Sequence, residues 1–478
     1  MNNDFTPMQL NQQGLDRLKR YRELLDFYRG QQWPSHATRG EKHLTFNYAK
    51  VVIDKVTSYL SSGVRCTIEA VEDSDEARAR ARRAEAALRQ VEQDNNLEQL
   101  TFETEIDCAI LGDACFKVTW DTERKAVRVT APDIQGIYAW WPGDDISRIW
   151  RVASKYNLTA EEAEIQHGVK SRGKTASIVE LWTDEHFDLW LDNTRVEKKA
   201  NPYGFIPFVI YPNLREPKKF WGISDLAQLI EPQQELNRAM SQLSRILELS
   251  GNPIAVLENV EESEDIAVKP GAVWNIPDEA KAYLLDLLQG GGVGLHINYI
   301  DLLYRTLHDV AETPRAAFGG TSRDLSGVAL EIELQPLLQK VWRKRLIRTT
   351  AYKKRSQLIL RLIEKYQNQD FGDHRLDVVW SPVLPRDLSR LVTNEQTLVQ
   401  NGIHSRRRAM YEVGVNNPEM EFNQWLEERQ AILRMNKELS ARSTAGGGRE
   451  RALKPKADYR LSQETNYEPD RDESHCQA

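Results

Sequence analysis

The sequence predicts a mainly helical α+β fold, and three observations lead to this prediction. Long stretches in both halves of the chain carry apolar residues at three- and four-residue spacing, which is typical of amphipathic helices. Residues 115–212 change to a period of two, with turn residues between short runs, which is typical of strands. The chain has 478 residues, 40% of them hydrophobic, so a large core with more than one module is expected.

Helices are predicted in the part of the chain that precedes these strands. Residues 14–30 and 43–63 each carry an amphipathic pattern that ends at a glycine, and Asn47 stands where it can cap the second helix. Residues 73–110 are rich in alanine, glutamate and arginine, and they predict one or two further helices. Their charges are interpreted as a solvated helix face rather than as an RNA-binding run.

After the strands, two predicted helices bracket an insertion. The first helix, at 224–250, has Ser224 or Asp225 able to cap its start, and the second lies at 293–313. Their apolar seams predict packing on neighbouring helices. The seam positions are Leu236, Met240, Leu243 and Leu247 in the first helix, and Ile297, Ile300 and Leu307 in the second. The insertion contains β-like runs and a short helical pattern at 279–288.

A glycine-rich polar loop at 314–325 precedes a helical pattern that runs from 326 to about 367, a rod of roughly 60 Å at ~1.5 Å per residue. This rod is strongly basic, and two interpretations are open: its cations lie along phosphate, or they form ion pairs with acidic residues of the protein. A strand at 376–380 and helices through 439 follow. The polar tail that begins at Ser440 has no apolar period and is expected to be disordered.

One segment matches a nucleotide-binding pattern. Residues Gly168 to Thr175 satisfy the P-loop consensus, but a working P-loop needs a strand before it and a helix after it. Here a helical pattern precedes the match and a strand pattern follows it. We therefore interpret the segment as a basic turn, and an enzyme that uses Lys174 on a nucleotide remains only an alternative.

Other chemical motifs are also weak. The nine histidines include no HExxH, and the four cysteines stand far apart, so no metal site and no disulfide framework is predicted. Five acids lie close together in a predicted surface loop, where they cannot converge on a metal pair as a nuclease requires. They predict a charged contact surface instead, and they are Glu258, Glu261, Glu262, Glu264 and Asp265. The chain is thus expected to have no catalytic residue and no cofactor.

Charge and hydropathy exclude further classes. The net charge of −7 argues against a protein that holds nucleic acid by overall attraction to phosphate. No apolar run approaches the ~20 residues needed to cross a bilayer, and the first residues lack the pattern of a secretion signal. A cytoplasm-like environment is therefore expected.

Five motifs, in order along about residues 20 to 430, resemble those of the portal proteins of tailed bacteriophages, in the family of the phage SPP1 portal. They are "NYAKVVIDKVTSYLSSG", "ILGDACFKVTW", "GFIPFVIYPN", "WGISDLAQLIEPQQELNRAMS" and "SGVALEIELQPLL". The resemblance implies a ring of identical subunits, commonly twelve, at one capsid vertex. It also implies that double-stranded DNA passes through this ring during packaging and ejection.

The resemblance further implies a division of the chain and a set of partners. The division is a wing at 1–223, stem helices at 224–250 and 293–313, a clip at 251–292, a tunnel loop at 314–325, a long kinked helix with a wing strand at 326–395, a crown at 396–439 and a disordered tail at 440–478. The partners would be the terminase large subunit, a head-completion or adaptor protein, and the major capsid and scaffolding proteins. Localisation would be the virion, with the host cytoplasm during assembly.

Residue roles follow from the same resemblance. The tunnel-loop residues near DNA would be Arg315, Phe318, Gly319, Gly320 and Arg323, and the long helix would bend at Pro336. The acidic group that begins at Glu258 would contact partners at the clip, and the apolar seams would pack the stem. A different virion structural protein, such as an adaptor or a scaffold, is the alternative.

Overall fold

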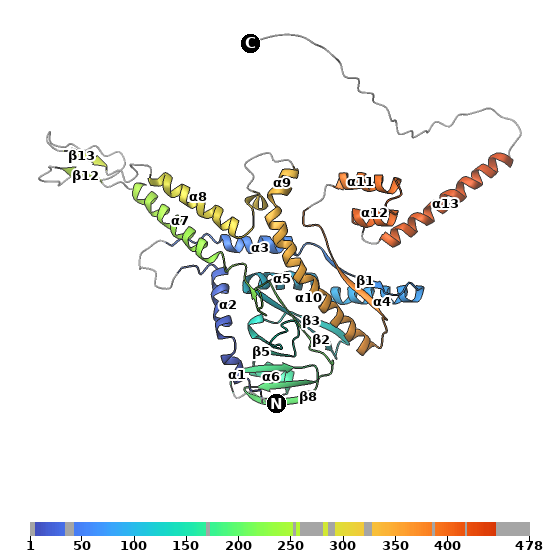
Figure 1. Cartoon of the computed structure of the whole chain (residues 1–478), viewed down its shortest axis with the longest axis horizontal. Helices are drawn as coiled ribbons and strands as arrows, with labels where there is room; N and C mark the ends of the chain where they lie inside the picture. Colours follow the sequence, from blue (N-terminus) through green and yellow to red (C-terminus); the bar gives the residue numbers. More distant parts are fainter. Residues whose placement is uncertain are drawn as a thin grey trace, which may run out of the picture. The chain divides into compact units, whose positions relative to one another are not determined.

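The computed structural model divides the chain into two compact units, Met1–Leu384 and Pro385–Ala478 (Figure 1). It describes residues 5–33, 43–168, 173–251, 255–258, 281–284, 292–319, 327–384, 388–415 and 418–445. Within these ranges, helices alternate with small antiparallel sheets. The predicted mainly helical α+β fold is confirmed. None of the described helices has both the length and the apolar composition to span a membrane.

The predicted N-terminal helices are present. The first unit begins with α1 (Met8–Gln12) and α2 (Leu15–Tyr28), followed by α3 (Tyr48–Leu60). Asn47 caps α3 as predicted, because its side-chain oxygen accepts a hydrogen bond from the backbone N–H of Lys50. The Asn47 amide nitrogen also donates to the carbonyl of Tyr28 at 2.8 Å, which fixes the end of α2 beside the start of α3.

Replacing Asn47 with alanine is expected to lower the free energy of unfolding by about 1–2 kcal/mol, because α3 loses its cap and α2 loses a link to it. Chemical denaturation measures this loss. Asn47→Asp is the matched control, since it keeps an oxygen acceptor for the Lys50 N–H but loses the amide nitrogen that donates to Tyr28. It should therefore recover the part of the stability that the cap contributes, and a cost equal to that of Asn47→Ala would assign the whole loss to the link with α2.

A three-stranded sheet forms the second layer of this unit. The helices α4 (Asp75–Asp94) and α5 (Leu97–Leu111) precede its central strand β2 (Asp113–Asp121), which pairs with β3 (Ala126–Thr130) and β9 (Phe208–Pro212). The buried rings of Phe116 and Tyr211 on this sheet contact Tyr352 of the long helix described below.

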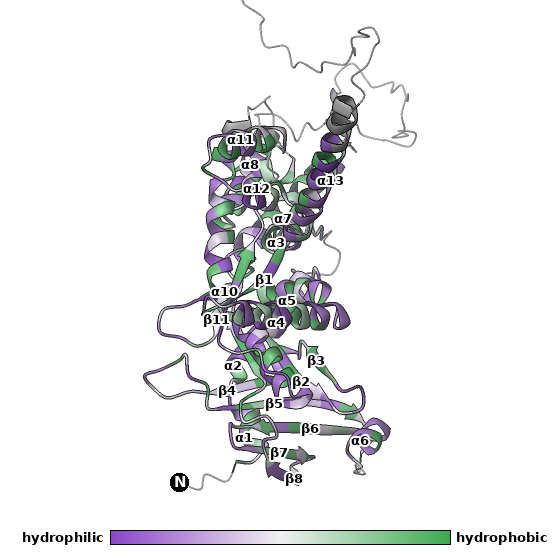
Figure 2. Ribbon diagram, turned by 90° about the vertical axis from the view of Figure 1, so that its right-hand side faces the viewer, coloured by the Kyte–Doolittle hydropathy of each residue, from purple (hydrophilic) through white to green (hydrophobic). Residues whose placement is uncertain are grey.

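The predicted strand region also contains a five-stranded antiparallel sheet. Its order is β4 (Ile137–Trp140), β5 (Arg151–Thr159), β6 (Thr175–Trp182), β7 (His186–Leu191) and β8 (Thr194–Ala200), with α6 (Ala160–His167) between β5 and β6. Figure 2 shows the edge strand β8 as mostly hydrophilic. Charged edge strands discourage pairing with other chains. A short 3-10 turn, η1 (Ile134–Gly136), leads into β4, and the two-residue strands β10 (Leu214–Arg215) and β11 (Gly222–Ile223) pair after β9.

The long basic segment forms two helices with a break between them. The first is α9 (Gly327–Glu333) and the second is α10 (Gln335–Gln367), which extends about 50 Å at ~1.5 Å per residue. Pro336 is the second residue of α10, where its missing N–H costs no hydrogen bond. The break between the two helices, at Leu334, thus lies two residues before the position where the bend was expected.

The strand predicted at 376–380 is β14 (His374–Trp380), and its partner was not foreseen. It pairs antiparallel with β1 (Val64–Ala70), which follows α3. Residues 64–70 alternate apolar and polar side chains, which is a strand pattern that the sequence analysis missed.

The two bracketing helices are α7 (Ile230–Gly251) and α8 (Gly292–Val310). The expectation that α7 starts at Ser224 or Asp225 is wrong, because the helix begins at Ile230 and Pro232 falls in its first turn, where proline is tolerated. Between the helices, β12 (Ala255–Glu258) pairs with β13 (Lys281–Leu284). The helix expected at 279–288 is therefore wrong at 281–284, where pairing with β12 fixes an extended backbone.

The second unit consists of α11 (Leu388–Gln400), α12 (Arg406–Val413) and α13 (Pro418–Ala445). The crown boundary expected at 396 falls inside α11, so a boundary before Leu388 fits this helix better. Helix α13 extends to Ala445, so disorder from 440 is wrong for its last six residues. The rest of the predicted disordered tail lies outside the described residues.

Candidate functional site

The candidate site is the hairpin formed by α7 and α8, together with its junction to α10. The two helices contact each other along the hairpin (Figure 1). Polar side chains fix its base to the N-terminal helices. The Gln233 side chain accepts a hydrogen bond from the Ala49 N–H and donates to the Phe46 carbonyl at 2.7 Å, and Asn237 accepts from the Phe46 N–H.

The predicted seam residues differ in burial along the hairpin. Leu236 and Leu307 are buried near the base, and Met240, Leu243 and Ile300 are partly buried. Leu247 and Ile297, farther from the base, are exposed. A single chain thus covers only the base of the predicted seam.

Helix α8 has a second apolar face, which the sequence analysis missed. Leu295 and Leu302 are 72% and 59% exposed, and Tyr299 between them is also exposed. Their spacing of four and three residues places them on one stripe, separate from the face of Ile300 and Leu307. This spacing is visible in the sequence, but it overlaps the stronger pattern of the inward face. A helix that is apolar on both sides is typical of one packed on both sides.

The segment after α8 leads to the predicted tunnel loop. The short 3-10 helix η2 (Arg315–Phe318) ends at Gly319, whose φ of +81° is one that glycine adopts without strain. The Arg315 guanidinium lies 5.0 Å from the centre of the Tyr304 ring and 3.9 Å from an Asp301 carboxylate oxygen. Arg315 is therefore held against α8. Gly320 and Arg323 lie outside the described residues.

A buried histidine supports the same segment. Nδ1 of His308 lies 2.7 Å from the Thr313 carbonyl, and the ring packs against Phe318 with 5.1 Å between ring centres. Burial lowers the pKa of His308, which favours the neutral ring that this packing requires. The residues that lead into the loop are thus fixed at the end of α8.

Helix α10 is joined to this segment by two of its basic residues. Nζ of Lys340 donates to the Ala311 carbonyl at 2.9 Å, and Arg343 forms an ion pair with Glu312. The end of α8 therefore lies against the first turns of α10.

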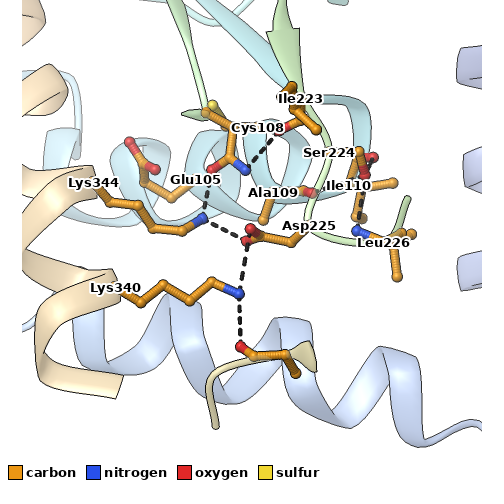
Figure 3. Close-up of polar contacts among 12 residues, drawn as sticks. Glu105, Cys108, Ala109, Ile110, Ile223, Ser224, Asp225, Leu226, Lys340 and Lys344 are labelled. Atoms are coloured by element: carbon orange, nitrogen blue, oxygen red, sulfur yellow. Dashed lines mark hydrogen bonds and ion pairs between the residues drawn. The ribbon is translucent and has the colours of Figure 1, made fainter. Parts of the chain in front are cut away.

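Lys340 also belongs to a buried ionic cluster (Figure 3). Asp225 lies between two lysines, with 2.5 Å to Lys344 Nζ and 3.5 Å to Lys340 Nζ. Lys344 also donates to the Asn213 side chain. Burial alone would raise the pKa of Asp225, but the positive charges of Lys340 and Lys344 hold it well below its usual range. Burial lowers the pKa of Lys344 to about 8, although Asp225 opposes this shift.

A second buried ion pair joins α10 to α5. Nε of Arg348 donates to Glu105 at 2.9 Å, and both side chains are fully buried. The hydroxyls of Tyr211 and Tyr352 donate to the other oxygen of the Glu105 carboxylate. Burial would lower the pKa of Arg348, but the negative charge of Glu105 raises it above its usual range. Arg348 therefore stays charged.

These contacts favour one of the two interpretations of the basic segment. Lys340, Lys344, Arg348 and Arg355 are buried and bond to other parts of the protein, so these four do not lie along phosphate. Their partners Glu105 and Asp225 are more than a hundred residues away in the sequence. No local spacing could have identified them.

The structure also bears on the rejected chemical motifs. Gly168 ends α6 and Lys174 precedes β6, so the order is helix then strand, as predicted, and not that of a P-loop. Residues 169–172 lie outside the described part. Glu258 accepts a hydrogen bond from Tyr283 across β12 and β13. The other four acids of this group, Glu261, Glu262, Glu264 and Asp265, lie outside the described residues. Among the described residues, no group of three His, Cys, Asp or Glu side chains could hold a metal ion.

A comparison with protein families identifies the class of protein that this arrangement belongs to. The profile of phage portal proteins of the SPP1 Gp6-like type matches residues 9–434. Because the match covers most of the 478 residues, the chain belongs to the SPP1 Gp6-like phage portal family. This is a family of structural components of the virion capsid. A search of curated proteins finds no match.

Proposed function

We propose that this chain is the subunit of a closed ring that acts as the portal at one capsid vertex, through which double-stranded DNA is packaged and ejected. By likeness to its family, the ring would be a dodecamer. The second apolar face of α8 carries this proposal. Leu295 and Leu302 face solvent in one chain, and burying an aliphatic side chain of this size contributes about 1.5–3 kcal/mol. A neighbouring copy would supply the missing cover.

The segments take their proposed roles from this arrangement. The hairpin of α7 and α8 is the stem, and the insertion with β12 and β13 is the clip. The segment from η2 to residue 325 is the tunnel loop, and α9 and α10 connect it to the wing, which contains the sheets. The second unit is the crown.

A conduit must let DNA slide, so its surface should not grip phosphate strongly. Each cation that neutralises a phosphate strengthens binding by releasing counterions. A net charge of −7 suits this requirement, and so does the placement of Arg315 beside Asp301, which reduces its pull on phosphate. Gly319, Gly320 and Arg323 would reach closest to DNA, with Phe318 as the anchor of the loop at His308.

The proposed partners follow from the same assignment. The clip, with Glu258 and the acids after it, would contact the terminase large subunit during packaging and a head-completion or adaptor protein afterwards. The crown and wing would contact the major capsid and scaffolding proteins. The ring would form in the host cytoplasm and remain in the virion.

Replacing Leu302 with glutamate is expected to abolish ring assembly while leaving the chain folded. The side chain is largely exposed in a single chain, so the charge costs little there, but it would be buried between copies without a partner. Negative-stain images of the purified protein would show rings for the unchanged chain and single subunits for the variant. Circular dichroism reports folding.

Ile165→Glu is the matched control, because Ile165 on α6 is an aliphatic residue outside the stem that is even more exposed than Leu302, at 76% against 59%. It should leave the rings intact. Rings formed by Leu302→Glu would contradict the stem contact. Open filaments or single subunits from the unchanged chain would favour a different virion structural protein, such as an adaptor or a scaffold.

A further inference from the structure

An arginine of the five-stranded sheet contacts several aromatic rings. Arg151 is the first residue of β5, and the carbon of its guanidinium lies 4.1 Å from the centre of the Trp140 ring and 4.6 Å from that of the Trp150 ring. The centre of the Phe5 ring is 5.5 Å from the same atom. Cation–π contacts of this kind hold a guanidinium in place and leave its N–H donors free for other partners.

Arg151 finds no polar partner within the described part of the chain. The side chain is half-buried, and its Nε atom is buried without a hydrogen bond. Burial lowers the pKa of Arg151, and no described carboxylate opposes this shift. Arg17 and Arg345 show the contrast, since both are partly buried against aromatic rings and both donate to main-chain carbonyls. Arg151 therefore keeps an unfilled set of hydrogen-bond donors.

The free edge of this guanidinium determines what can bind to it. Its two Nη atoms make no hydrogen bond with the described residues and, in contrast to Nε, are not buried. Two adjacent N–H donors in one plane fit the two oxygens of a carboxylate, and such charge-assisted pairs are among the stronger hydrogen bonds. Trp150 beside it is 44% exposed, so a ligand can also cover apolar surface. Tryptophan and arginine are residue types that often dominate the binding energy of protein interfaces.

The loop between β4 and β5 argues against DNA as the ligand. It contains Asp144 and Asp145, and both are exposed. Duplex DNA carries one negative charge per ~1.7 Å of its axis, so it would bring several phosphates close to these carboxylates. A protein segment can place a single carboxylate on Arg151 with neutral residues on either side of it. The combination of a stacked arginine, an exposed tryptophan and nearby aspartates therefore favours a protein segment.

We propose that Arg151, Trp140 and Trp150 form a docking site for a segment of another protein in which an aspartate or glutamate stands beside an apolar residue. The carboxylate accepts hydrogen bonds from the Arg151 guanidinium, and the apolar side chain covers Trp150. Figure 2 shows β4 and β5 well below α7 and α8, so this site is separate from the proposed stem. The assignment of the partner to the virion rests on the proposed function, whereas the binding chemistry does not.

Fluorescence anisotropy with labelled peptides tests the site on the full chain. The probe is a short fluorescein-labelled peptide of glutamate, leucine and glycine, and the matched probe has glutamine in place of each glutamate. The unchanged chain should bind the glutamate probe about tenfold more tightly than the glutamine probe, because hydrogen bonds to a charged group are lost in the second. Arg151→Gln should remove this tenfold preference. Arg148→Gln is the matched control, since Arg148 is an exposed arginine of the same loop, and it should leave the preference unchanged.

Several outcomes would overturn the site. Equal binding of the two probes, no binding of either, or an Arg151→Gln chain that keeps the preference would each do so. Trp150→Ala is a second variant in case Arg151→Gln fails to fold, because Trp150 is partly exposed, and it should also weaken binding of the glutamate probe. A labelled DNA duplex that bound more tightly than the peptide, and lost this binding in Arg151→Gln, would assign Arg151 to phosphate and exclude the protein segment.

Electron micrographs separate this site from the proposed function. Arg151→Gln should form the same rings as the unchanged chain, because the site is separate from α7 and α8. Rings without a preference for the glutamate probe would overturn the docking site and leave the portal standing. A preference for the glutamate probe in a chain that forms no rings would keep the docking site and overturn the portal.

Discussion

Replacing Arg348 with methionine is expected to lower the free energy of unfolding by about 3–5 kcal/mol. Methionine fills most of the volume, but it leaves the Glu105 carboxylate buried without its cation. The two tyrosine hydroxyls that donate to Glu105 cannot replace a full positive charge. The carbonyl and the side-chain oxygen of Asn213 also lose the guanidinium that donates to them. Urea denaturation followed by circular dichroism measures the loss.

The double variant Glu105→Gln with Arg348→Met is the control for this prediction. A glutamine keeps an oxygen for the tyrosine hydroxyls and removes the uncompensated charge. Replacing a buried ion pair by neutral groups of similar size is often close to neutral, so the double variant should recover most of the stability. A double variant as unstable as Arg348→Met alone would mean that packing, and not the unpaired carboxylate, sets the cost.

Replacing Asp225 with asparagine is expected to have a cost of similar size, about 3–5 kcal/mol near neutral pH. Lys344 is fully buried, and it would keep only the Asn213 oxygen as a polar partner. Lys340 would lose the same anion while still donating to Ala311. Because α10, the end of α8 and the segment before α7 meet at this cluster, the variant should also reduce ring formation.

The pH dependence tests the role of the lysine. Without Asp225, the folded chain should hold Lys344 neutral at neutral pH, whereas the unfolded chain binds the proton up to about pH 10.4. The unfolded state then binds more protons, so the stability of the variant rises with pH. In the unchanged chain, folded Lys344 keeps its proton up to about pH 8, so this lysine makes the free energy of unfolding rise with pH only above that value. The difference in free energy of unfolding between the unchanged chain and Asp225→Asn should therefore narrow from pH 6 to pH 8.

Glu216→Gln is the matched control for Asp225→Asn. Glu216 forms its ion pair with Lys219 at the surface, where such pairs contribute about 0–1 kcal/mol. It should change the free energy of unfolding little at any pH. If the difference in free energy of unfolding between Asp225→Asn and the unchanged chain widened as the pH rises, the proton of Lys344 would not be the cause of the pH dependence.

Acid should also destabilise the unchanged chain through Asp225. Its pKa is low only in the folded state, so below about pH 3.9 the unfolded chain binds a proton that the folded chain does not. The contribution of this carboxylate is complete above that pH and is lost as the pH falls further. Asp225→Asn removes this part of the acid sensitivity, which acid titrations of both proteins measure.

Local patterns predicted much of the fold. The cap at Asn47, the change from helices to strands and the pair of bracketing helices each depend on residues within a few positions of one another. Errors arose where a distant partner decides. Residues 281–284 are extended because β12 pairs with them, and the pairing of β1 with β14 joins segments far apart in the sequence. Neither partner can be read from the local spacing.

The candidate site divides in the same way. The sequence determined that α7 and α8 carry apolar seams and that the chain resembles the portal family, because helix periodicity and short motifs are properties of neighbouring residues. Only the tertiary structure decided that Lys344 and Arg348 are internal ion-pair residues, and that α8 keeps an apolar face uncovered. Burial and charge pairing depend on which residues meet in space, and in this protein those residues come from segments more than a hundred positions apart.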